Sequence, residues 1–272
     1  MAYVDLSVAK RRLAWADGHI KRFEAKALDF LQSDPYLIVA DIEPKTGDEV
    51  FRVKFIKPFP DCLGLIAADA LHNLRSILDH LAYAVALLPT SQPVNLKNVS
   101  FPICLEASGS QAPPGGFFSQ YEGGPLLGVV QGGIEVIRGL QPYQRPKPTG
   151  APRETDILWM LNRLWNDDKH KTVNVIGACS RRSRARMKNV TVDLSKGNVP
   201  SPFTFGPMKD GKEVARIPAH VKVEGDLEMK FIFDITFDQA PPGYGAQVNT
   251  FLRHTHDFIR DEVIPVFGQN FS

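Results

Sequence analysis

Polar side chains able to transfer protons, bind anions or ligate metal ions are concentrated between residues 69 and 83. Their spacing places them along one side of a helix. Residues 61–88 contain no Lys or Glu, which are common on solvated helix faces. We therefore interpret this polar stripe as semi-buried and specifically hydrogen-bonded. Its members are Asp69, His72, Asn73, Arg75, Ser76, Asp79, His80 and Tyr83.

A second segment, 154–178, predicts a helix with a similar polar face. A second interpretation is equally good: Asp167 or Asp168 is the N-cap of a new helix after a break. We expect the two segments to be in contact, with stripe residues within reach of Asn166 or His170. The shared face comprises Asp156, Trp159, Arg163, Asn166, Asp167, His170 and Asn174.

Other helices must position these two segments. Apolar residues recur at three- and four-residue steps from Leu6 to Phe30, which predicts an amphipathic helix that ends at Asp34-Pro35. A long helix covers roughly 61–88, with its apolar side opposite the stripe. A weaker helix is predicted over about 126–140, and a last one over about 246–264.

Alternating apolar residues predict strands on either side of the helical region. A hairpin covers 36–43 and 49–57, and further strands cover 187–194, 213–217 and 227–237, with a hairpin turn at 224–226. The fold class is α+β: a bundle of about four long helices with a mostly antiparallel sheet from the N-terminal hairpin and the C-terminal strands. We expect one domain over 1–272, with Pro- and Gly-rich loop insertions at about 89–125 and 141–153.

Composition excludes several classes of protein. The 43% hydrophobic content is that of a globular chain, and a net charge of +2 does not by itself indicate a nucleic-acid or membrane partner. The three widely spaced cysteines fit a reducing compartment. The N-terminus has no signal-peptide pattern, and charges interrupt the longest apolar stretch, so we expect a cytoplasmic protein without a membrane partner. The chain has no phosphate-binding loop, nucleophile elbow or zinc motif.

Four motifs together resemble a widespread group of uncharacterised bacterial proteins: His72-Asn-Leu-Arg-Ser-Ile-Leu-Asp-His80, Phe101-Pro-Ile103, Leu140-Gln-Pro-Tyr143 and Asp168-Lys-His-Lys171. The similarity covers most of the first 175 residues and implies kinship without an activity. In addition, Arg75-x4-His80 resembles the arginine–histidine signature of HEPN domains, which are helical bundles that often act as metal-independent ribonucleases. Ser76 departs from the Asn, Asp or His usual after the arginine, and the predicted sheet departs from their all-helical fold.

The HEPN resemblance implies a homodimeric endoribonuclease without a cofactor and with RNA as its partner. His80 would act as general base or acid, and Arg75 would stabilise the negative charge of the transition state. A basic cluster at 180–188 would hold phosphates, although a solvated turn explains it as well. The expected catalytic residues are Arg75, His80, His72, Asn73 and Asp79, and the expected binding residues are Asn166, His170, Tyr83, Arg184 and Arg186.

Two further interpretations belong to other functional classes. Asp69-x-x-His72 and Asp167-x-x-His170 set a carboxylate and an imidazole three residues apart, as Glu-x-x-His pairs do in di-iron bundles, and Glu24 or Glu262 would add a ligand. Alternatively, the stripe is a buried polar network that fixes helix register, in a protein that binds partners without catalysis.

Overall fold

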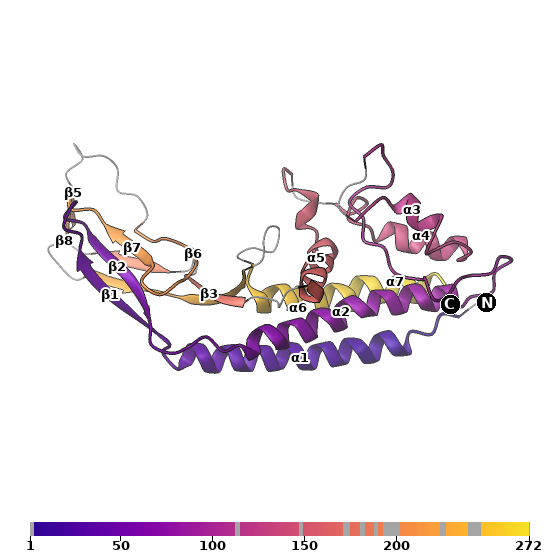
Figure 1. The fold of residues 1–272 in the computed structure, drawn as a ribbon, viewed down its shortest axis with the longest axis horizontal. Helices are drawn as coiled ribbons and strands as arrows, with labels where there is room; N and C mark the ends of the chain where they lie inside the picture. The colour runs from indigo at the N-terminus through magenta and orange to yellow at the C-terminus, as the bar shows by residue number, and fades with distance from the viewer. Residues whose placement is uncertain are drawn as a thin grey trace.

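The α+β class is confirmed by the computed structural model, which describes residues 3–111, 115–146, 149–170, 175–179, 183–187, 190–192, 202–223, 227–238 and 246–271. Figure 1 shows an elongated molecule in which α1, α2 and the C-terminal helices run side by side along the long axis. The strands lie at one end, while α3, α4 and α5 lie along one side of α2.

The two longest helices are α1 (Ser7–Gln32) and α2 (Cys62–Ala86), and they pack against each other. The apolar positions predicted from the three- and four-residue periodicity are buried in both helices, so this prediction is confirmed. The C-terminal element begins as α6 (Val248–Phe258), passes through a π-helical turn (Ile259–Val263) and ends as α7 (Ile264–Gln269). α6 contacts α1, α2 and α5, which completes the main core.

Shorter helices cover α2. α5 spans Ile157–His170 and contacts α2 directly, as expected. It follows a single 3₁₀ turn at Arg153–Thr155. α4 (Gln131–Gly139) also contacts α2, and α3 (Phe118–Glu122) lies within the predicted loop 89–125. None of the described helices combines the length and the apolar character needed to cross a membrane.

The strands within the described residues all pair antiparallel. β1 (Tyr36–Ile42), β2 (Glu49–Phe55) and β7 (Glu213–Ile217) form one sheet in that order. A second sheet has the order β10 (Phe233–Phe237), β3 (Val175–Cys179) and β6 (Gly206–Pro207). Two ribbons pair β4 (Arg184–Met187) with β9 (Leu227–Lys230), and β5 (Val190–Val192) with β8 (Val221–Val223).

Three details of the predicted elements are wrong. The helix predicted to reach residue 178 ends at His170, and Val175–Cys179 is instead the strand β3, because it pairs with β10. The strand predicted over 227–237 is divided into β9 and β10, and the strand predicted over 187–194 corresponds to the end of β4 and to β5. β8 and β9 pair with β5 and β4 rather than with each other, so they do not form the hairpin predicted around 224–226. Residues 224–226 themselves lie outside the described residues.

Candidate functional site

Arg75 lies in the buried middle of α2, with only 5% of its surface exposed. Its Nε donates to Asn162 Oδ1 of α5 over 3.1 Å, and its Nη2 donates to the backbone carbonyl of Phe101 over 2.8 Å. Nη1 lies 2.8 Å from Asp79 Oδ1, an ion pair without the angles of a hydrogen bond. The guanidinium lies 5.0 Å from the ring centre of Trp165, within the range of a cation–π contact. All three nitrogens therefore have partners within the chain.

Asp79 completes this clamp from the next turn of α2. Its Oδ1 accepts a hydrogen bond from the backbone N–H of Phe101 over 2.9 Å. The N–H and the carbonyl of Phe101 are thus both bonded to side chains of α2, one turn apart. Phe101 is 1% exposed, so the clamp fixes the point where the long loop after α2 enters the core.

Gln141 holds the following residues of the same loop. Its Oε1 accepts from the backbone N–H of Cys104 over 2.9 Å, and its Nε2 donates to the carbonyls of Pro102 and Ile137 at 3.0 Å each. Gln141 is fully buried, so these bonds replace those that water would supply. The stripe, the Phe101-Pro-Ile103 motif and the Leu140-Gln-Pro-Tyr143 motif therefore meet in one buried polar network.

The contacts between α2 and α5 use residues that the sequence did not single out. Trp165 Nε1 donates to His72 Nδ1 over 3.2 Å, and Asn162 bonds to Arg75. Asn166, which we expected at this position, is half-buried, and the hydrogen bonds between the described parts of α2 and α5 do not include it. The His170 side chain lies outside the described residues. Asn162 and Trp165 lie three residues apart, a spacing that places them on the same face of a helix. This spacing is the sequence signal that could have identified them as contacts of α2.

His80 and Tyr83 lie at the accessible end of the stripe, beside the start of α1. His80 is half-buried and Tyr83 is exposed. Burial, with the nearby charge of Arg12, lowers the pKa of His80, so its imidazole is mostly neutral at physiological pH. Both side chains line a cavity of about 410 Å³ together with Tyr3, Asp5, Val8, Ala9, Ala84, Leu87 and Leu88.

Away from this cavity, side chains of α1 contact the polar stripe of α2 at two further points. Arg12 Nη1 donates to Asn73 Oδ1 over 3.5 Å, a long hydrogen bond. His19 Nδ1 lies 3.7 Å from Asp69 Oδ2 and packs edge-on against Trp15, whose side chain is 66% exposed. The stripe is therefore divided: Asn73 and Arg75 are buried, Ser76, Asp79 and His80 are half-buried, and Asp69, His72 and Tyr83 are exposed.

The residues of the metal hypothesis do not come together in the described part of the chain. Asp69 is exposed beside His19, and Asp167 is half-buried on α5. Both carboxylate oxygens of Glu24 bond to Arg253, at 2.7 and 2.6 Å. Among the described residues, no group of three His, Cys, Asp or Glu side chains has the arrangement of a metal site.

The expected phosphate-binding arginines belong to the β region. Arg184 is exposed on β4, and its Nη1 donates to the carbonyl of Ser183 over 3.3 Å. The Arg186 backbone pairs with Glu228 of β9, while its side chain lies outside the described residues. The strands, and with them these two arginines of β4, lie at the end of the molecule opposite α4 and α7 (Figure 1).

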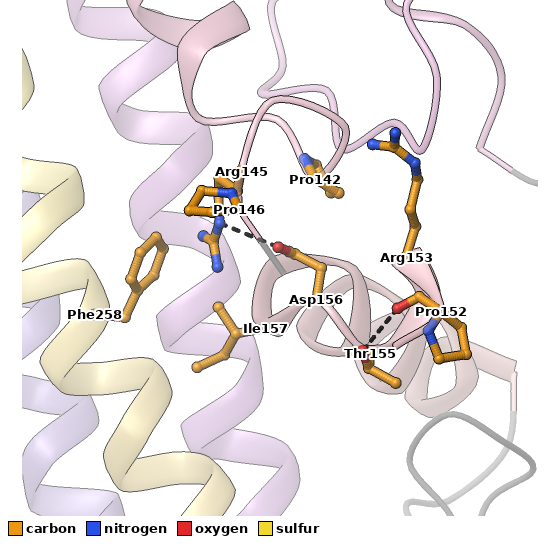
Figure 2. Close-up of a pocket in the computed structure, with 9 residues that line it drawn as sticks. All are labelled: Pro142, Arg145, Pro146, Pro152, Arg153, Thr155, Asp156, Ile157 and Phe258. Carbon is orange, nitrogen blue, oxygen red and sulfur yellow. Dashed lines mark hydrogen bonds and ion pairs between the residues drawn. The ribbon is translucent and has the colours of Figure 1, made fainter. Parts of the chain in front are cut away.

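A second cavity, of about 280 Å³, lies where the loop after α4 meets the start of α5 (Figure 2). Arg145 stacks over Phe258 at 4.1 Å from its ring centre and pairs with Asp156, with 3.1 Å between Nε and Oδ2. Asp156 also accepts from the backbone N–H of Leu158 over 2.9 Å and so caps α5. The charge of Arg145 is thus already neutralised by Asp156, while Arg153 points away from this carboxylate (Figure 2).

Comparison with known proteins gives no relative: no family model, no curated protein and no solved structure matches this chain.

Proposed function

We propose that this protein binds single-stranded RNA on the exposed surface shared by α1 and α2, and that it does so without cleavage by Arg75. The observation that carries the proposal is Trp15, a 66% exposed indole between arginines on a helix. Exposed aromatic rings stack on bases, while neighbouring cations bind the phosphates. We call this surface the outer face, and it comprises Arg11, Arg12, Trp15, His19, Arg22, Lys26, His72, His80 and Tyr83.

Helical geometry supports a continuous track along α1. At 100° per residue, Arg11, Trp15, Arg22 and Lys26 point to the same side of the helix, and all four are exposed. At 1.5 Å per residue they extend over about 22 Å, which is enough for several nucleotides of an extended strand. The hydrogen bond from Arg12 to Asn73 and the 3.7 Å contact between His19 and Asp69 join this track to α2.

The charge balance of α1 also favours an anionic partner. Arg253 of α6 binds Asp17 at 2.5 Å and Glu24 at 2.6 Å, so these two carboxylates face the helix bundle. Within the described part of the chain, no carboxylate forms an ion pair with Arg11, Arg22 or Lys26. Their charges are therefore available to neutralise phosphates.

The burial of Arg75 is evidence for RNA binding without cleavage at this residue. Its guanidinium is enclosed and bonded to Asn162, Phe101 and Asp79. A phosphate could reach it only after these contacts broke, which leaves buried polar groups without partners. Arg12, not Arg75, is the arginine whose charge lowers the pKa of His80, after the effect of burial.

The test is fluorescence anisotropy with a labelled 12-nucleotide oligouridine, measured over a range of salt concentrations. Trp15→Ala should weaken binding by about 5- to 150-fold, because stacking of one base is worth roughly 1–3 kcal/mol. Arg11→Ala with Arg22→Ala should reduce the salt dependence of the binding constant by about 0.7 for each phosphate that is no longer neutralised.

Two other exposed residues of α1, Leu28 and Lys10, provide matched controls because they lie outside the outer face. Leu28→Ala and Lys10→Ala should leave the affinity unchanged. Equal effects of Lys10→Ala and Arg22→Ala would contradict the proposal, since attraction would then depend only on total charge. RNA cleavage that a folded Arg75→Ala variant lacks would overturn the assignment of Arg75.

A further inference from the structure

The cavity at the end of the outer face has the size and chemistry of a small ligand site. Its volume of about 410 Å³ falls within the range of small-molecule pockets. Apolar side chains from α1 and α2 form much of its lining, and Tyr3 and Tyr83, 76% and 40% exposed, add aromatic surface. An apolar lining with a few polar groups suits a flat heteroaromatic ring such as a nucleobase.

Asp5 is the acidic side chain in the lining of this cavity. Its Oδ1 accepts from the backbone N–H of Ser7 over 2.8 Å, and this fixes the carboxylate at the start of α1. The same bond is the main cause that lowers the pKa of Asp5, so the group is ionised at neutral pH and accepts hydrogen bonds only. The Ser7 side chain also bonds to this carboxylate, and the charge of Arg11 acts on it. A carboxylate has about four lone-pair sites, so acceptor sites remain for a ligand.

An ionised carboxylate selects a base by its pattern of donors. Guanine offers two adjacent donors on its Watson–Crick edge, the N1–H and the N2 amino group, which match the two carboxylate oxygens. Adenine and cytosine set a ring-nitrogen acceptor beside their amino group, and uracil sets carbonyls on both sides of its single N–H. Each of these acceptors would face the carboxylate and repel it.

We infer that this cavity binds one unstacked guanine of the RNA, with Asp5 accepting hydrogen bonds from its Watson–Crick edge and Tyr3 and Tyr83 flanking the ring. His80 also lines the cavity. Its neutral imidazole can donate or accept one further hydrogen bond. This inference rests on the proposed function, and it adds a sequence preference that the outer face alone does not provide.

The experiment compares a 12-nucleotide oligouridine with the same strand carrying one central guanine or one central adenine. The intact protein should bind the guanine strand about tenfold or more tightly than the other two, as expected for hydrogen bonds to a charged group. Asp5→Asn should remove this preference and leave oligouridine binding unchanged. The asparagine Oδ1 still accepts from Ser7, so the helix start is preserved.

A second variant blocks the cavity instead of changing its charge. Ala84 is half-buried in the cavity lining, and Ala84→Phe should also remove the guanine preference while circular dichroism and oligouridine binding stay as in the parent. A guanine preference that survives both variants would overturn the inference, as would equal binding of all three strands.

Guanosine monophosphate separates this inference from the proposed function. Ligand-observed NMR with this nucleotide does not depend on Trp15 or on the cations of α1 that the RNA-binding proposal requires. If no strand binds but the nucleotide does, and Asp5→Asn abolishes that signal, the guanine site stands and the RNA-binding proposal fails. If oligouridine binds through Trp15 and the nucleotide gives no signal, the RNA-binding proposal stands and the guanine site fails.

Discussion

Arg75 of α2 donates a hydrogen bond from Nη2 to the backbone carbonyl of Phe101, 26 positions further along the chain, over 2.8 Å. Asp79 accepts from the N–H of the same residue. An arginine whose type and position suggest chemistry thus holds a loop in place. Replacement of Arg75 should therefore lower the stability of the fold, because removing one member of a buried charge network leaves the others without a partner.

Arg75→Ala should lower the free energy of unfolding by about 3–5 kcal/mol, because Asp79, Asn162 and the Phe101 carbonyl lose their partner. Arg75→Lys should lower it less but still clearly, since an ammonium keeps the charge and loses the fork of donors. Urea denaturation measures both. Arg12→Ala is the matched control, because Arg12 is half-exposed and makes one long hydrogen bond; a loss as large as that of Arg75→Ala would contradict the clamp.

Gln141→Glu tests the second part of the network. An ionised Glu accepts from Cys104 but cannot donate to the carbonyls of Pro102 and Ile137. We therefore expect a loss of roughly 2–4 kcal/mol at neutral pH that diminishes on acidification, when the carboxyl group regains a proton. Urea denaturation at several pH values measures the change, and a pH-independent loss would exclude this mechanism. Gln144→Glu, at an exposed position, is the control.

Periodicity predicted the fold best where one face of an element is buried. The apolar positions of α1 and α2 are buried as expected, and the β1–β2 hairpin has nearly its predicted bounds. β3 was missed because Val175–Cys179 follows α5 closely and its strand conformation depends on pairing with β10, more than 50 residues further along the chain. Local propensity contains no information on such a partner.

The site was predicted only in part, for a related reason. The polar stripe was recognised as semi-buried, but the sequence does not reveal which members face inward, because that depends on how α5 crosses α2. Asn162 and Trp165 were therefore missed as partners of Arg75 and His72. Gln141 was recognised only within a motif, since a single glutamine after a helix has no periodic pattern that predicts three buried hydrogen bonds.

Asp156 should make stability depend on pH in the direction opposite to most carboxylates. Burial raises its pKa, partly offset by Arg145 and by the N–H groups of Leu158 and Trp159. A raised folded-state pKa contributes stability below the unfolded value of about 3.9, and this contribution is lost as pH rises through the folded value. Asp156→Asn keeps the cap acceptor without ionising, so the stability of the variant relative to the parent should increase from about pH 3 to about pH 7.

Asp17 provides the control of opposite sign for this pH experiment. Hydrogen bonds from Lys21, and then from Arg253, lower the pKa of Asp17. Its contribution to stability is present above the unfolded pKa and lost as pH falls through the folded value. Asp17→Asn should therefore lose stability relative to the parent as pH rises over the same range. Urea denaturation of all three proteins at each pH measures both differences, and parallel curves would refute the assignment.

The last prediction concerns Tyr36 and Gly177, which join the two sheets. The Tyr36 hydroxyl is buried without a hydrogen-bond partner among the described residues, and burial raises its pKa to about 12. A Cβ on Gly177 would overlap with that oxygen and lie 3.0 Å from the flexible end of Met208. Tyr36→Phe should therefore increase stability by about 1 kcal/mol, since it removes an unsatisfied buried hydroxyl. Gly177→Ala should destabilise the parent by about 1–3 kcal/mol through overpacking, and clearly less in the Tyr36→Phe background, where the closest atom is absent. A double-mutant cycle of unfolding free energies measures this coupling, and additive effects would show that the two positions do not contact each other.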